Sequence, residues 1–395
     1  MSVVHRGFRR ALLLPVVTVA VTTAATLRPA AAQGQAQDVA ISPSARVSFD
    51  TVGYVGGEAD IASTAFVRSV RLGMTATLAE DDFFKVEFDL AEREVEWENI
   101  HAGRSWGRHA VTVGERKVPL SLNRVTSAGS LLFGERAAPV DVLTDSSRFG
   151  LHYSWREPVG PPVGRTAQTM LFTRSANDDE HDAPVGLAQR LVLHREDAHG
   201  RVLHAGAAVA AERLDREQTV RLRGGPEARL ERGEQYLLDT EEIDEVTEVI
   251  TSGVEAAYQN PSLSVQAELL RKDLLREDGP SLTFRGGYVQ LSWRPNGEPL
   301  SYDGNRFGDP SGPPADHGAW EWVARYARLD LQDGPYRGGR QDTVTAGVNW
   351  HVSRRVVYKA NIVRHRIRNS DATVRGTRIG NEDAAVVLLR AQLQI

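Results

Sequence analysis

The sequence repeatedly alternates apolar and polar residues, and this pattern limits the folds that the chain can adopt. In residues 343–352, valine, alanine and tryptophan take one phase, while threonine, asparagine and histidine take the other. A second alternating run starts at Val356, after a polar break at 353–355. Because successive side chains of a strand point to opposite faces, the two runs predict a β-hairpin with one apolar and one polar face.

Further stretches repeat this scheme and reach the last residue. Each is short enough for one strand and has one continuous apolar face. The final run places Leu389, Ala391, Leu393 and Ile395 on that face, so the chain ends inside a predicted strand. A last strand that pairs with the first closes a barrel. The other runs are residues 71–78, 84–90, 148–155, 263–269 and 287–293.

The N-terminal residues indicate export. A basic start at 5–10 precedes an apolar stretch at 11–27 and a small-residue site that ends at Ala32. This order is typical of a secretory signal peptide, which we expect at residues 1–32. The chain has no cysteine, so an exported form must be stabilised without disulfides. We expect a short segment at 33–44 and a single β-barrel domain at 45–395.

A soluble β-sandwich is the main alternative to a membrane barrel, since alternation alone fits both folds. Mean hydropathy is slightly negative, and no run of about 18 apolar residues follows the signal. Neither observation excludes a membrane barrel, because its strands are short and alternate apolar with polar residues. Aromatic residues near strand ends, export without cysteine, and connections of alternating length favour the barrel. At about 10 residues per strand, the length predicts an all-β transmembrane antiparallel β-barrel of about sixteen strands.

The connections between the predicted strands differ in length. Segments 353–355 and 295–298 are short, whereas 306–318 and 369–383 are long and polar. We expect the short connections at the periplasmic rim and the long ones at the outer rim. Segment 119–145 has no alternation of its own and is too long for a turn. We therefore expect it to fold into the lumen as a constriction.

Several stretches resemble one protein family, the phosphate-selective porin O and P family of outer-membrane proteins. The resemblance implies an outer-membrane location and a homotrimer of barrels with about sixteen strands each. It also implies loops folded into the lumen and an anion-favouring path lined by arginine. The stretches, in chain order, are VRSVRLGM (67–74), VTVGERKVPLSLNRVTSAGSLLFGER (111–136), GVEAAYQNPSLSVQAELLRKDL (253–274), GGYVQLSWRPNGEPLSY (286–302), GAWEWVARYARLDL (318–331), DTVTAGVNWHVSRRVVYKANIV (342–363) and the closing strand.

Cations in the polar phase are the candidate anion-binding residues. Arginine stays charged and offers several donors to phosphate oxygens, and a pore needs several weak sites rather than one tight site. Arg124 lies where the family often has a basic residue, whereas Arg136 is expected to pair with Glu135. The alternative is that inward carboxylates such as Glu321 merely balance these cations, since the net charge is −5. The candidate set is Arg71, Lys85, Arg116, Arg124, Arg148, Arg190, Arg221, Arg223, Lys272, Arg294, Arg325, Lys359 and Arg390.

These features predict a porin for the passive uptake of phosphate or related small anions, surrounded by outer-membrane lipid and without a nucleic-acid partner. Lysine occurs at only four positions, which favours anion preference over phosphate selectivity. No cofactor or metal site is expected, because His194, His199 and His204 fall on separate elements. No G-x-S-x-G or H-E-x-x-H motif is present, so we expect no enzyme. A non-selective or structural barrel and an outer-membrane hydrolase are the alternatives.

Overall fold

The structure is a computed structural model in which sixteen antiparallel strands close into one barrel. It describes residues 39–57, 61–78, 81–91, 95–160, 163–178, 184–214, 219–229, 236–311 and 317–395. The expected signal peptide at 1–32 lies outside the described residues. The predicted fold class and the predicted number of strands are confirmed.

The wall strands follow one another around the barrel in chain order, and each pairs antiparallel with its neighbours. Two small sheets are not part of the wall: β10 (Arg223–Gly224) with β11 (Leu238–Asp239), and β15 (Leu300–Tyr302) with β16 (Phe307–Pro310). Among the described residues, no helix has the length and apolar character needed to cross a membrane. The wall strands are β1 (Ala40–Gly56), β2 (Thr64–Leu78), β3 (Asp82–Asp89), β4 (Glu96–Trp106), β5 (His109–Lys117), β6 (Ser147–Arg156), β7 (Gly164–Phe172), β8 (Val185–Glu196), β9 (Val202–Arg213), β12 (Val246–Gln259), β13 (Leu263–Arg276), β14 (Leu282–Trp293), β17 (Ala319–Asp333), β18 (Tyr336–His351), β19 (Val356–Val374) and β20 (Thr377–Gln394).

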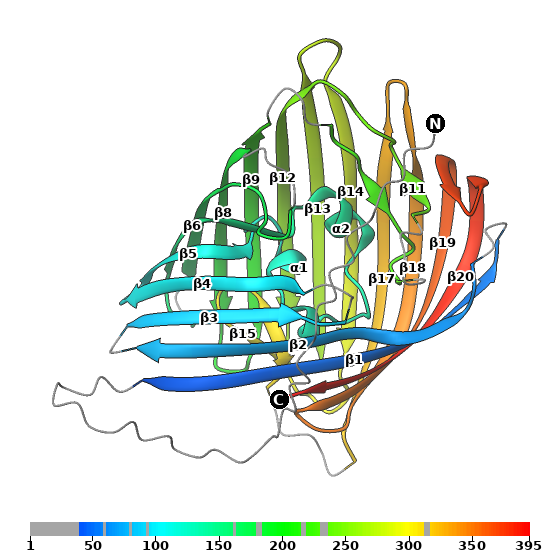
Figure 1. The fold of residues 1–395 in the computed structure, drawn as a ribbon. Coiled ribbons are helices and arrows are strands. Elements are labelled where there is room, and N and C mark those ends of the chain that lie inside the picture. The colour runs from blue at the N-terminus through cyan, green and yellow to red at the C-terminus, as the bar shows by residue number, and fades with distance from the viewer. Residues whose placement is uncertain are drawn as a thin grey trace, which may run out of the picture. The chain divides into compact units, whose positions relative to one another are not determined.

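The first and last strands close the ring, as the chain ending predicted. Their pairing extends to Gly56, which lies opposite Ala384. At the other end, the Ala45 N–H donates to the Ile395 carbonyl (3.0 Å), and the Ile395 N–H donates back (2.8 Å). Figure 1 shows β1 in blue beside β20 in red. We call the rim at which Ala45 and Ile395 meet the terminal rim.

The two faces of the strands differ in burial, in the phase that the alternation predicted. On β20, Leu389 is 50% exposed on the outer face, whereas its neighbours Leu388 and Arg390 are 1% and 6% exposed on the inner face. On β19, Ile362 is exposed outside and Asn361 is buried inside. Apolar residues on the outer face of such a barrel contact lipid, and the polar face is left for the lumen.

One long connection lies on the rim where only short ones were expected. Segments 295–298 and 306–318 both belong to the connection 294–318 between β14 and β17, on the same terminal rim as the turn 353–355. The sorting of these two segments to different rims was therefore wrong. The other terminal-rim connections are short, which assigns this rim to the periplasmic side.

The predicted loop at 369–383 is mostly strand. β19 continues to Val374 and β20 begins at Thr377, so only a tight turn separates them. The polar composition suggested a loop, but these residues are polar because this part of the hairpin extends past the apolar band of the outer face. Its outward residues, such as Arg366 and Asp383, are charged and pair with each other (3.4 Å).

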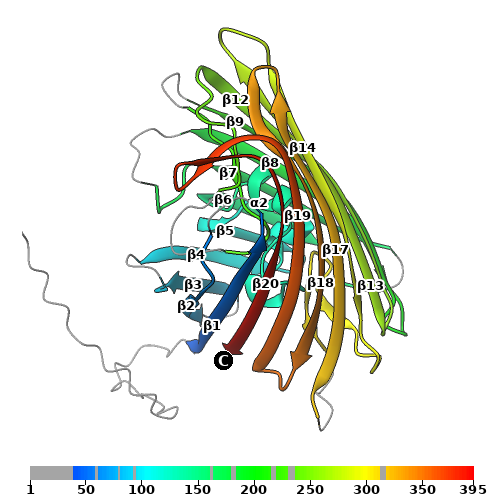
Figure 2. The ribbon, with the colours of Figure 1, turned by 90° about the vertical axis from the view of Figure 1, so that its right-hand side faces the viewer.

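The segment between β5 and β6 folds into the barrel, as predicted. Its apolar side chains Val140 and Leu143 join a cluster with Leu274, Phe284 and Leu329 of the wall. Figure 1 shows both helices of this segment enclosed by the strands, and Figure 2 shows α2 from another side. We call residues 118–146 the lumen loop. It contains α1 (Leu122–Val125), the 3-10 turn η1 (Ala128–Ser130) and α2 (Ala138–Leu143).

Replacing Leu389 by Arg should lower the free energy of unfolding by about 2–4 kcal/mol, because the guanidinium would lie in the apolar band near the middle of the membrane. The matched control is Arg364→Gln on β19, an outward residue that is already polar and exposed. It should change stability by no more than about 0.5 kcal/mol. Urea midpoints of protein folded into lipid vesicles measure both, and equal losses would contradict the lipid-facing assignment of Leu389.

Candidate functional site

Side chains of several wall strands hold the backbone of the lumen loop. Glu268 on β13 accepts hydrogen bonds from the backbone N–H groups of Leu122 (3.1 Å) and Asn123 (2.7 Å). The loop is therefore fixed across the barrel, and its position decides where open space remains in the lumen. Further anchors are the bonds from Asn349 to the Leu132 carbonyl (2.9 Å), from the Gly134 N–H to Asn361 (2.9 Å) and from Gln392 to the Gly129 carbonyl (3.0 Å).

Arg124 has a structural role that the sequence did not predict. Its guanidinium donates to the carbonyls of Val140 (2.9 Å) and Thr144 (3.1 Å) and to the Thr144 hydroxyl (2.9 Å). These carbonyls lie at the C-terminal end of α2, where the backbone donors of a helix run out, although the Thr144 N–H still reaches the Val140 carbonyl (3.2 Å). With only 7% exposure, Arg124 leaves little of its surface for the anion binding that we expected of it.

The expected pair between Glu135 and Arg136 is also wrong. Glu135 instead binds Arg68 (2.7 Å) and Arg390 (3.0 Å), while Arg136 donates to the carbonyls of Asn123 and Thr126. Burial alone would raise the pKa of Glu135, but the two arginines outweigh burial and hold its pKa below the ordinary value. Burial, with Arg124 nearby, lowers the pKa of Arg136 to about 9, which leaves this residue charged at neutral pH.

A cavity of about 200 Å³ lies between the lumen loop and the strands β1, β2 and β20. Seven cationic side chains but only three carboxylates line it, so its walls carry an excess of positive charge. We call it the basic cavity. Its cations are Arg46, Arg68, Arg71, Lys117, Arg124, Arg136 and Arg390, and its carboxylates are Glu98, Glu135 and Asp141.

Three of the predicted residues, Arg71, Arg124 and Arg390, are brought together in the basic cavity, and four others were missed. Arg68 is out of phase with Arg71, so strict alternation excluded it. The pairing of β1 with β2 shifts register between Ser48 and Phe49, and this irregularity gives Arg68 its inward position. Arg46 shares the phase of the inward residues Ser48 and Asp50, a signal that could have found it. The remaining missed residues are Lys117 and Arg136.

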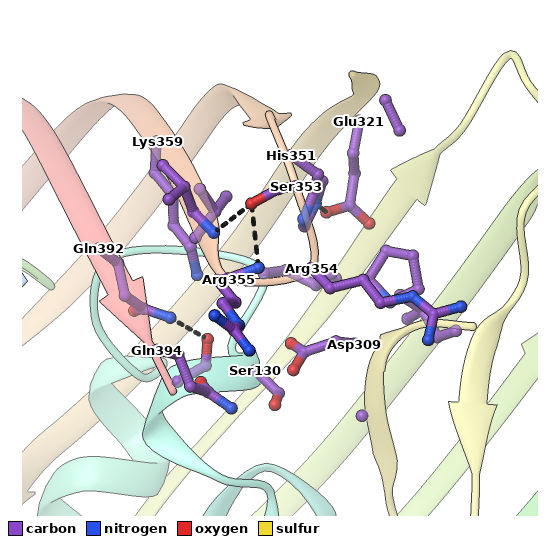
Figure 3. A pocket seen from close by; sticks show the side chains of 18 of the residues that line it. Ser130, Asp309, Glu321, His351, Ser353, Arg354, Arg355, Lys359, Gln392 and Gln394 are labelled. Atoms are coloured by element: carbon purple, nitrogen blue, oxygen red, sulfur yellow. Dashed lines mark hydrogen bonds and ion pairs between the residues drawn. The ribbon is translucent and has the colours of Figure 1, made fainter. Parts of the chain in front are cut away.

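A second pocket, of about 270 Å³, lies at the terminal rim, and we call it the mouth pocket. Figure 3 shows Lys359, Arg355 and Arg354 around it, together with Asp309 and Glu321. Positive and negative groups are nearly balanced here, since Glu298 also lines the pocket. Leu131 and Gln392 line both this pocket and the basic cavity, so the two spaces adjoin.

A third cavity, of about 330 Å³, lies towards the opposite rim. The predicted residues Arg148, Arg221 and Lys272 line it, but Asp145, Asp178 and Glu212 do so as well. Arg221 and Arg223 were expected in the polar phase of the predicted strands. Both instead belong to the connection between β9 and β12, where Arg221 pairs with Asp239 (2.5 Å) and Arg223 lies over the ring of Tyr236 (4.3 Å).

Three predicted residues are buried in ion pairs. Arg190 has no exposed surface and binds Glu255 (2.5 Å) and Asn305. A permeating ion has no access to such a group, so these residues fit the alternative of structural neutralisation. The other two pairs are Arg294 with Glu321 (3.2 Å) and Arg325 with Glu227 (2.7 Å). Of the remaining predicted residues, Lys85 pairs with Glu87 (3.1 Å), and Arg116 donates to Thr112 (2.9 Å).

The three histidines form no common site. His194 and His204 lie opposite each other on β8 and β9, and His199 lies in the turn between these strands. His204 contacts Tyr302 (2.7 Å) and Glu255 (2.9 Å), which attaches the connection 294–318 to the wall. Within the described residues, no group of three or more His, Asp or Glu side chains is arranged to hold a metal ion.

A closed sixteen-stranded barrel, with an apolar outer face and a charged lumen crossed by an internal loop, is the architecture of an outer-membrane porin. The comparison with protein families agrees: the chain belongs to the phosphate-selective porin O and P family, whose family model matches residues 44–395. The protein is therefore located in the outer membrane.

Solved structures share the fold. The trimer form of OmpT, an outer-membrane protein of Vibrio cholerae, is 13% identical with a TM-score of 0.57, and the match covers 90% of this chain and 99% of that one. The anion-selective porin from Comamonas acidovorans is 14% identical with a TM-score of 0.54, covering 91% and 100%. At these identities the likeness concerns the fold alone.

A sequence relative is an uncharacterised protein of Caulobacter vibrioides. It is 28% identical over 298 residues, which make up 72% of this chain and 59% of that protein. The chain thus spans less than two thirds of the length of the relative.

Replacing Arg124 by Ala should destabilise the lumen loop by about 1–3 kcal/mol, because the carbonyls of Asp141 and Thr144 lose their guanidinium donor. Limited proteolysis of the folded protein, followed by mass mapping of cuts within 118–146, measures the loss. Arg201→Ala is the control, since Arg201 is exposed in a turn and Asp197 is its sole ion-pair partner among the described residues. Unchanged protection of the loop in Arg124→Ala would show that the cap is dispensable.

Proposed function

We propose that the protein forms a water-filled channel that favours anions and serves the passive uptake of phosphate or related anions. The observation that carries the proposal is the excess of seven cations over three carboxylates around the basic cavity. This cavity lies beside the lumen loop, where the loop narrows the barrel. Fixed charges in a narrow, low-dielectric space act on ions more strongly than the same charges on an open surface.

The geometry of the basic cavity fits weak and repeated binding. Several of its arginines are already engaged by carboxylates, as Arg71 is by Asp89 (3.1 Å) and Arg390 by Asp50 (2.7 Å). Each therefore offers only part of its charge, and a conducting pore requires sites that bind an ion without trapping it. Arg46 makes no hydrogen bond or ion pair with another described residue, so its charge is the most available.

The neighbouring mouth pocket suggests that ions are selected by charge only at the basic cavity. Its nearly balanced charges neither attract nor repel an anion strongly, which lets an ion leave the basic cavity towards the terminal rim. Because arginine dominates the basic cavity and Lys117 is its one lysine, we infer a preference for oxyanions in general rather than a single tight phosphate site.

We further propose a homotrimer. The wall is lower on one side: β3 and β7 have 8 and 9 residues, whereas β19 and β20 have 19 and 18. A low wall is suited to contact with other copies, since short strands are shielded there by neighbouring subunits. Unboiled protein in detergent should migrate as a trimer and shift to a monomer on boiling. Migration at the monomer position before and after heating would contradict the trimer.

Replacing Arg46 by Glu should reduce or reverse the anion preference, because it changes the charge of the basic cavity by two units. Single-channel recording across a potassium chloride gradient reports the preference as the sign of the reversal potential. Arg104→Glu is the control, since Arg104 is 65% exposed on the outer face of β4 and pairs with Asp82. It should leave the reversal potential unchanged.

Two outcomes would contradict the anion channel. Potassium passing in preference to chloride in the unmodified protein would exclude it outright. Equal passage of both ions, together with no effect of Arg46→Glu, would instead support the non-selective barrel.

A further inference from the structure

The outer face of β12, β13, β14 and β17 carries exposed apolar side chains next to a hollow. Val254, Leu269, Val289 and Tyr326 are all exposed there, and Leu269 reaches 66% exposure. They line a groove of about 920 Å³ on the outside of the barrel, within the size range of small-molecule sites. This groove is separate from the three spaces in the lumen.

Glycine makes the groove. Gly287 lies directly opposite Leu269 in the pairing of β14 with β13, and its missing side chain leaves the hollow beside Leu269. A Cβ at Gly287 would come within 2.6 Å of a Leu269 methyl group and 2.8 Å of the Glu268 carbonyl. A larger residue at this position therefore both fills the groove and disturbs the wall.

The groove changes from apolar to cationic at one end. Arg285 and Arg328 line this end and follow Gly287 and Tyr326, respectively, along their strands towards the rim opposite the terminal rim. Asp330 also lines it but is already bound by Arg340 (2.7 Å). Arg328 makes a long contact with Asp342 (3.8 Å) and also interacts with the Tyr326 side chain.

Arg285 is the second arginine at this end of the groove, and Asp330 lies opposite it in the pairing of β14 with β17. No hydrogen bond or ion pair joins its guanidinium to another described residue. The backbone around Arg285 is paired with β13 and β17 as part of the wall. Arg285 lies where the apolar part of the outer face ends. From the terminal rim, the outward residues of β14 are Trp293, Leu291 and Val289, then Gly287, and then Arg285. Lipid head groups lie at this level.

We propose that this groove binds an anionic lipid of the outer leaflet, with an acyl chain along Leu269, Val289 and Tyr326 and an anionic head on Arg285 and Arg328. The leaflet follows from the cationic end, which points away from the periplasmic terminal rim. A guanidinium holds phosphate or carboxylate oxygens through parallel hydrogen bonds. The proposal depends on the outer-membrane location and is independent of ion selectivity in the lumen.

A lipid fits this surface better than a second copy of the chain. A subunit contact would bury Arg285, whose guanidinium forms no ion pair with a described carboxylate, and this burial carries a large desolvation cost. The groove also lies on the side of the tall strands, away from the low wall formed by β3 to β7. A mobile acyl chain fills an irregular groove, and the anionic head neutralises the guanidinium.

The test uses the complete protein in mild detergent and native mass spectrometry, with diphosphoryl lipid A as the probe and phosphatidylcholine as the zwitterionic comparison. The unmodified protein should retain lipid A at least several-fold better than phosphatidylcholine. Arg285→Ala combined with Arg328→Ala should lower lipid A retention about tenfold. Arg104→Ala, which removes an outward arginine near the terminal rim, should leave it unchanged.

Val289→Trp tests the apolar half of the groove while keeping both arginines, and it should lower lipid A retention by a similar factor. Heat-dependent gel migration shows that each variant is folded, and an unchanged reversal potential shows that the lumen is intact. Equal retention of lipid A by the double variant and the unmodified protein would overturn the proposal. So would displacement of lipid A by millimolar inorganic phosphate, or loss of the oligomer in the double variant, which would assign the groove to a subunit contact.

Discussion

The continuous ring of backbone hydrogen bonds is the constraint on which the rest of this structure depends. In the apolar part of a membrane, no water is available to satisfy N–H and C=O groups, so a sheet is tolerated only without edges. The pairing of β1 with β20, completed by the mutual bonds of Ala45 and Ile395, removes the last edge. Once the ring is closed, the outer face must be apolar where it meets the membrane interior, and at that level the polar side chains of the alternating strands are directed into the lumen.

Because the polar side chains are directed inward, the lumen must be filled and its charges must be paired. Sixteen strands enclose more space than their own side chains can fill, and charged groups inside a low-dielectric wall need partners. The lumen loop and the connection 294–318 supply both volume and partners. Arg124 secures α2, Glu268 holds the start of α1, and Glu255 joins Arg190 to His204. Most inward charges are therefore structural, and the few spaces left open acquire their character from the charges that remain.

The distribution of the remaining charge separates two functions on two surfaces. Inside, the cations around the basic cavity outnumber the carboxylates, whereas the mouth pocket is nearly neutral. Outside, charged residues begin where the apolar face ends, and most of them pair across strands, as Arg340 does with Asp330. Arg285 departs from that rule beside a groove that Gly287 leaves open. On both surfaces the proposed binding depends on a cation without an ion-pair partner among the described residues, Arg46 inside and Arg285 outside.

Alternation along each strand was enough to predict the barrel, the outward position of Leu389 and the inward position of Arg390, because side-chain direction in a strand is set locally with a period of two. The absence of alternation in 119–145 likewise predicted the lumen loop. The site was a different matter. The alternation predicts that Arg190 and Arg71 both point inward. It does not predict that Arg190 is buried in an ion pair with Glu255, whereas Arg71 lines an open cavity. It also excluded Arg68, which reaches the basic cavity through a register shift that involves a second strand. Which inward charges remain available depends on contacts between residues far apart in the chain, and only the tertiary structure decides them.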